Sequence, residues 1–99
     1  MNTMEFCCQT ESTNVLNFYL HALDLRKQEK YSEAIDLNKE ILNRYPYFFQ
    51  SYIELIEIYG RNLKDKRKAN ELYNIGYNLA RKKGCSYIFD ELEAIVGVL

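Results

Sequence analysis

The sequence is poor in residues that interrupt regular structure, with one proline and four glycines among 99 residues. This scarcity excludes collagen-like and linker-rich segments, and the length predicts a single domain. No apolar run reaches the roughly 20 residues that a membrane span requires, so we expect no membrane partner. Residues 1–13 carry neither a basic region nor an apolar stretch, so no signal peptide is expected there.

Residues that could perform catalysis or hold a metal are also scarce. His21 is the one histidine, and catalysis would need a nucleophile or a carboxylate held beside it. The cysteines form no C-x-x-C pair, since Cys7 and Cys8 are adjacent and Cys85 is far from both, which argues against zinc. The glycines are isolated, so no phosphate-binding loop is predicted. We therefore predict a protein that is not an enzyme and that binds no cofactor and no metal.

These features have simpler interpretations. Three cysteines without a pairing pattern are typical of reduced thiols, which predicts a cytoplasmic protein. His21 follows the helical period, so we expect it to pack in the core. Glu54 and Glu57 are three residues apart and could converge on a cation, although we favour solvated carboxylates at both positions.

The charge is unevenly distributed although the net charge is only −1. The stretch 61–83 holds eight basic and two acidic residues, a local charge of +6, whereas the remaining five basic and twelve acidic residues give −7. Such an asymmetry can steer a charged partner, including a nucleic acid. A solvated helical surface that tolerates lysine and arginine is the simpler explanation, and we favour it.

The hydrophobic pattern predicts helices throughout, over about residues 13–29, 32–45, 48–60, 65–84 and 86–98. Ser32 and Asp65 are expected N-caps, and Gly60 and Gly84 are expected at helix C-termini. The third segment is apolar on most sides, which is typical of a helix at the centre of a bundle. No segment alternates with a period of two, so we predict an all-α fold of about five helices in antiparallel hairpins.

The pattern repeats after 34 or 35 residues, a period that marks arrays of helical hairpins. The chain resembles the tetratricopeptide repeat (TPR) family, with Phe18, Ala22, Leu25, Ala34 and Pro46 in the first repeat and Tyr52, Leu55, Tyr59, Ala69 and Tyr73 in the second. Asn38 stands where the family has an aromatic residue. The resemblance implies an α-α superhelix with repeats over about 15–48 and 49–83. A capping helix over about 86–98 would follow them, within a domain spanning 14–99 that a flexible tail, residues 1–13, precedes.

A related class, the half-a-tetratricopeptide repeat of RNA-processing factors, could include residues 52–79. We favour the ordinary repeat because of the spacing of Ala34 and Pro46. In that family, peptides lie along a concave surface, so the resemblance implies a small adaptor or scaffold for protein–protein interaction. The partner-binding residues would be Leu16, Tyr19, Leu23, Arg26, Gln50, Ile53, Glu57, Arg61, Ile88 and Leu92.

Some family members hold a peptide carboxylate with paired asparagines, but Leu23 and Glu57 stand at those positions, so such a clamp is not expected. The remaining groove is apolar and suits an amphipathic helix or an extended apolar segment. Three alternatives stay open: RNA binding by residues 61–83, self-association of a structural subunit as a homodimer, and a groove filled by the fifth helix.

Overall fold

The structure is a computed structural model that describes residues 13–85 and 87–97, and those ranges contain no strand. Five α-helices follow one another: α2 (Thr13–Lys27), α3 (Tyr31–Arg44), α4 (Phe49–Glu57), α5 (Lys66–Lys83) and α6 (Tyr87–Gly97). A π-helical turn, η1 (Ile58–Asn62), continues α4. The prediction of an all-α fold with about five helices is confirmed. The predicted flexible tail lies, apart from Thr13, outside the described residues.

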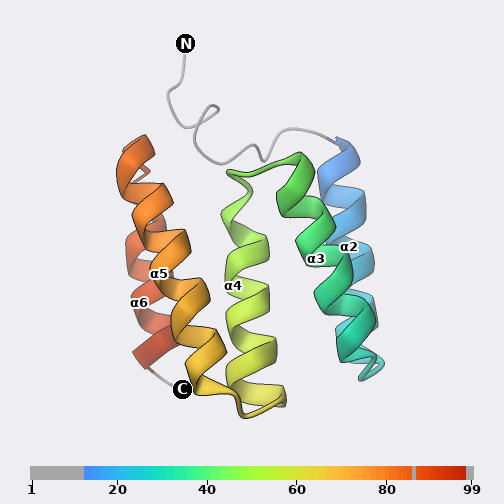
Figure 1. The fold of residues 1–99 in the computed structure, drawn as a ribbon. Coiled ribbons are helices and arrows are strands. Elements are labelled where there is room, and N and C mark those ends of the chain that lie inside the picture. The colour runs from blue at the N-terminus through green and yellow to red at the C-terminus, as the bar shows by residue number, and fades with distance from the viewer. Residues whose placement is uncertain (1–12, 86, 98–99) are drawn as a thin grey trace.

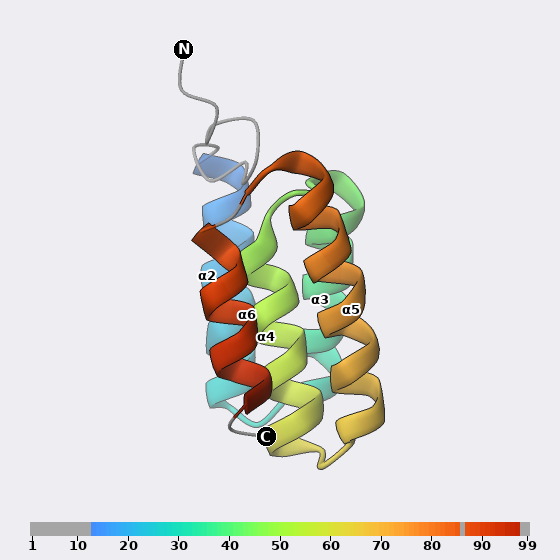
Figure 2. The ribbon, with the colours of Figure 1, turned by 90° about the vertical axis from the view of Figure 1, so that its left-hand side faces the viewer.

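The helices form antiparallel hairpins that stand side by side (Figure 1). α2 packs on α3, α4 packs on α5, and the contact between α3 and α4 joins the two hairpins. α6 packs against both α4 and α5 and so covers the end of the second hairpin. In Figure 2, α2 and α6 lie on one side of α4, whereas α3 and α5 lie on the other. One face of the protein is therefore built from α2, α4 and α6.

Local signals set both ends of α5 as the sequence predicts. The Asp65 carboxylate accepts a hydrogen bond from the backbone N–H of Lys68 at 3.0 Å, which satisfies a donor left unpaired in the first turn. Gly84 ends the helix with φ +74°, a left-handed conformation that glycine adopts without steric cost.

Two predicted helix ends are wrong. α3 begins at Tyr31, with Lys30 before it and no side-chain cap, so Ser32 lies inside the first turn. The reason is a tight connection, because Glu29 takes φ +61° and the Lys30 N–H bonds to the Leu25 carbonyl at 2.9 Å. Gly60 does not end the third helix either, since it is buried within η1, which continues to Asn62.

α4 is the central helix, as its apolar composition predicts. Phe49 and Ile56 pack with residues of α5 and α6, while Leu55 packs with Ala34 and Ile35 of α3. Each of these side chains is fully or almost fully buried, and burying one such residue contributes about 1.5–3 kcal/mol. α4 therefore couples the two hairpins into one core. Over the ranges that the structure covers, no helix combines the length and apolarity needed to cross a membrane.

The buried stripe of α2 consists of Val15 and Ala22, with Phe18 and Leu25 partly buried beside it. His21 is exposed, so the prediction that it packs in the core is wrong. The stripe is narrow, and successive side chains along a helix differ in direction by about 100°. His21 therefore points away from the buried side of α2, where Ala22 lies.

The position that departs from the TPR pattern, Asn38, is fully buried. Its side-chain N–H donates to the Ala34 carbonyl at 2.9 Å, while its Oδ1 has no hydrogen-bond partner. Asn38 thus satisfies its buried side-chain N–H by bonding back to its own helix. Ala34, Ala69 and Gly76 are buried as well, which fits the close helix contacts that small residues permit.

Candidate partner-binding site

On the face built from α2, α4 and α6, ion pairs join Arg26 of α2, Glu54 and Glu57 of α4 and Arg61 of η1, and we call this set the ladder. Arg26 Nη1 of α2 lies 2.8 Å from Glu54 Oε1 and 3.5 Å from Glu57 Oε1, both on α4. Arg26 Nε donates to Asn62 Oδ1 at 3.1 Å, and Arg61 Nη1 lies 3.8 Å from Glu57 Oε2. The two carboxylates therefore do converge on a cation, and that cation is the guanidinium of Arg26.

Glu54 is the buried member of this ladder, with its side chain only 4% exposed. The prediction that it is solvated is therefore wrong. Burial raises the pKa of Glu54, and the hydrogen bond from Arg26 offsets part of that rise. Burial alone would lower the pKa of Arg26, but its hydrogen bond and charge interaction with Glu54 raise it instead. Each charge offsets the cost of removing the other from water. Because Arg26 belongs to α2 and Glu54 to α4, the pair joins the two helices.

Tyr19 lies close to the ladder on α2. Burial, together with the negative charges of Glu54 and Glu57, raises the pKa of Tyr19 to about 12. Its phenol therefore stays protonated at neutral pH. The ring meets Phe48 edge to face, with the centroids 5.3 Å apart, which holds Tyr19 against the first hairpin.

Two depressions flank the ladder. The first has a volume of about 430 Å³ and is lined by Leu20, Leu23, Asp24, Arg26, Lys27, Glu54 and Asn62. The second has a volume of about 370 Å³ and is lined by Gln50, Ile53, Arg61, Glu91, Ala94 and Ile95. We call these two depressions and the ladder between them the inner face. Each depression offers aliphatic side chains beside charged ones, which suits an amphipathic segment.

The structure brings most of the predicted partner-binding residues to this face. Leu23, Arg26, Gln50, Ile53 and Arg61 line the two depressions. Glu57 joins Arg26 to Arg61 in the ladder. Leu16 is exposed on α2, and Tyr19 is half-buried.

Ile88 and Leu92 are placed differently from the prediction. Both are 0% exposed and belong to the core that α6 forms with Phe49 and Ile56 of α4. They cannot line an open groove, because α6 turns its apolar stripe onto α4 and α5. The side of α6 that remains open carries Glu91, Ala94 and Ile95.

Sequence reasoning missed Leu20, which is 60% exposed in the first depression. It lies outside the stripe of Val15, Phe18, Ala22 and Leu25 on the same helix, and an apolar residue outside that stripe was the available signal. Asn62 was also missed, and Glu54 was expected to be solvated, because the role of both depends on Arg26, which is 36 and 28 residues away along the chain.

The basic residues of the stretch 61–83 do not form one patch. Lys66 and Arg81 lie near opposite ends of α5, and 15 residues of helix separate them by about 22 Å. No group of three histidine, cysteine, aspartate or glutamate side chains within the described ranges could hold a metal. Cys85 is a buried thiol, while Cys7 and Cys8 lie outside those ranges.

Comparisons with protein-family models, with curated proteins and with solved structures found no match to this chain.

Proposed function

We propose that the protein is a TPR-like interaction module, acting as a cytoplasmic adaptor or scaffold that binds an amphipathic helical segment of another protein on its inner face. The observation that carries this proposal is the pair of aliphatic-lined depressions on either side of the Arg26–Glu54–Glu57 ladder. Side chains three to four residues apart on one helix face project together, and in our proposal successive side chains of one partner helix occupy the two depressions.

Binding at this face uses a scaffold that is already ordered. Arg26 is held by two carboxylates and by Asn62. Its charge is therefore already paired within the protein, and in our proposal it forms part of the surface on which the partner packs. Arg61 is held more loosely, since its side chain is 51% exposed and its contact with Glu57 is 3.8 Å. In our proposal, Leu20, Leu23 and Ile95 supply the apolar contacts, while Ile53, which is only 8% exposed, forms part of the floor. Arg61 and Glu91 pair with polar groups at the edge.

RNA binding receives less support from the geometry. The separation of the basic residues along α5 leaves no continuous track for a phosphate backbone, which such binding uses. Self-association remains the chief competitor, because a second copy of the chain could cover the same aliphatic side chains.

A selection experiment tests the proposal without knowledge of the natural partner. A random helical peptide library displayed on phage is selected on the wild-type protein, and enriched peptides are measured by fluorescence polarisation. We expect at least one family of peptides to lose affinity about tenfold with Leu20→Ser, since one buried aliphatic side chain contributes roughly that much. Ile75→Ser, which changes an exposed residue of α5, is the matched control and should leave those peptides bound.

Two outcomes would contradict peptide binding on the inner face. One is the absence of any enriched peptide that depends on Leu20. The other is a dimer in multi-angle light scattering that Leu20→Ser converts to a monomer, which would assign the inner face to self-association.

A further inference from the structure

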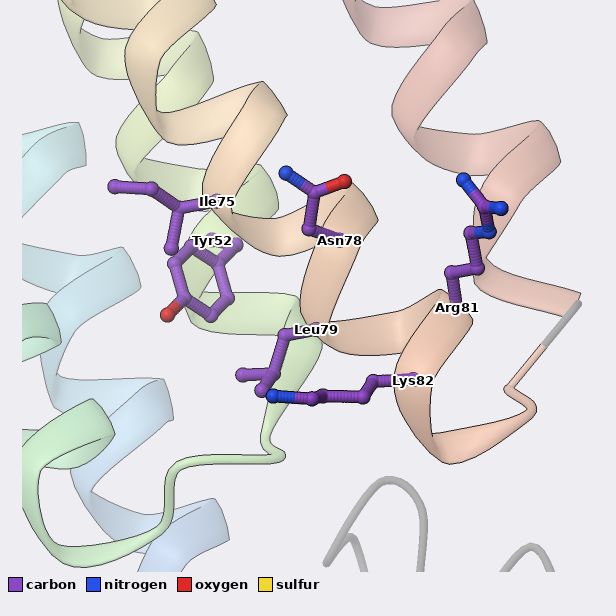
Figure 3. A pocket seen from close by; sticks show the side chains of 6 residues that line it. All are labelled: Tyr52, Ile75, Asn78, Leu79, Arg81 and Lys82. Atoms are coloured by element: carbon purple, nitrogen blue, oxygen red, sulfur yellow. The ribbon is translucent and has the colours of Figure 1, made fainter.

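A third and larger depression lies on the other side of α4, away from the inner face. Its volume is about 610 Å³, and it is lined by Tyr52, Ile75, Asn78, Leu79, Arg81 and Lys82 (Figure 3). Tyr52 and Gln50 point to nearly opposite sides of α4, because two residues turn a helix by about 200°. We call this surface the α5 depression, since all its lining residues except Tyr52 belong to α5.

The floor of the α5 depression is apolar and is shaped by a glycine. A Cβ at position 76 would lie 3.3 Å from Cγ of Tyr52, so Gly76 lets the Tyr52 ring approach α5 closely. Figure 3 shows this ring between Ile75 and Leu79. Ile75 is 52% exposed and lies beside two other apolar side chains, Tyr52 and Leu79, so the three together offer a small apolar patch to a partner.

The charges around this floor have one sign. Arg81 and Lys82 line the depression, and none of its six lining residues is acidic. Among the ion pairs of the described residues, none involves Arg81 or Lys82. Figure 3 shows that Lys82 runs alongside Leu79. Arg81 lies farther from the Tyr52 ring, on the opposite side of Asn78. The C-terminus of α5 favours cations in its last turn, where Arg81 and Lys82 lie. This preference does not explain why an exposed isoleucine, Ile75, lines the same depression.

We propose that the α5 depression binds an acidic amphipathic segment of a partner protein, independently of the inner face. One large apolar side chain of that segment packs against Tyr52, Ile75 and Leu79. Carboxylates that flank it pair with Lys82 and Arg81, neither of which forms an ion pair with a carboxylate of the described residues. A nucleic acid fits less well, because its phosphates would meet two cations while leaving Ile75 and Leu79 uncovered.

The test uses the same peptide library with a different counter-screen. Peptides enriched on the wild-type protein are screened again on Ile75→Ser, with Leu20→Ser as the matched control. We expect the peptides lost on Ile75→Ser to combine aromatic or aliphatic residues with an excess of Asp and Glu. Their Kd should rise about tenfold with Ile75→Ser and about threefold with Lys82→Gln, and increasing salt should weaken them further. Circular dichroism checks that both variants fold as the wild type does.

Several results would overturn this assignment. If no enriched peptide depends on Ile75, or if the dependent peptides lack acidic residues, the surface does not bind such a segment. A single-stranded RNA of about 12 nucleotides that binds through Arg81 and Lys82 regardless of Ile75 would assign the surface to nucleic acid. A dimer in light scattering that Ile75→Ser dissociates would assign it to a second copy. If every enriched peptide depends on Leu20 and none on Ile75, binding at the inner face is supported and binding at the α5 depression is contradicted.

Discussion

The inner face and the α5 depression differ in how their charges are held. On the inner face, Arg26 is paired with Glu54 and Glu57 within the protein. In the α5 depression, Arg81 and Lys82 line an apolar floor, and neither takes part in any ion pair of the described residues. Removing one member of a buried pair destabilises the fold because the other charge is left uncompensated, whereas unpaired surface charges are available to a partner. The comparison therefore predicts that removing Arg26 lowers the stability of the fold, whereas removing Arg81 and Lys82 chiefly lowers the affinity for a partner.

The largest effect is expected from Leu92→Ala, which tests whether the buried stripe of α6 is part of the core. Leu92 is fully buried with Ile88 and Phe49, and such truncations cost about 2–5 kcal/mol. We expect the free energy of unfolding to fall by about 3 kcal/mol in urea titrations, in a single transition. A loss below about 1 kcal/mol would show that α6 is a loosely attached cap.

Arg26→Ala should come next, because it leaves the buried Glu54 carboxylate without its cation. We expect a loss of about 2 kcal/mol, below the range for fully buried pairs because Arg26 is itself partly exposed. Arg61→Ala is the matched control, and it should cost less than about 0.5 kcal/mol because its contact with Glu57 is long and exposed. Equal losses for the two arginines would show that the depth of Glu54 does not decide the ladder's contribution.

The smallest effect on stability is expected in the α5 depression. Replacement of both Arg81 and Lys82 by glutamine should lower the free energy of unfolding by no more than about 1 kcal/mol, because it loses no ion pair of the described residues and weakens only the interaction with the C-terminus of α5. The same variant should weaken the acidic peptides selected on the wild-type protein. A substantial loss of stability would mean that these cations hold the fold together, and the contrast between the two surfaces would disappear.

Several residues that the resemblance to a repeat family assigned to partner binding lie together on the inner face, whereas those assigned from the last helix are buried in the core. Leu23, Gln50 and Ile53 follow from the register of their own helices, and they do line the depressions. Ile88 and Leu92 also lie on one apolar stripe of their helix. Such a stripe looks the same in the sequence whether it faces a groove or the core. Only the packing of α6 on α4 and α5 distinguishes the two.

The sequence by itself determined the helices, the end of α5 at Gly84, its cap at Asp65 and the central place of α4. These features depend on interactions within a few residues and on the period of the apolar side chains, which a sequence displays directly. The tertiary structure alone decided that Glu54 is buried, that Arg26 holds it, and that Tyr52 and Ile75 share an apolar floor. Each of those contacts joins residues 23 to 28 positions apart on different helices, so it depends on how the hairpins pack rather than on any local pattern.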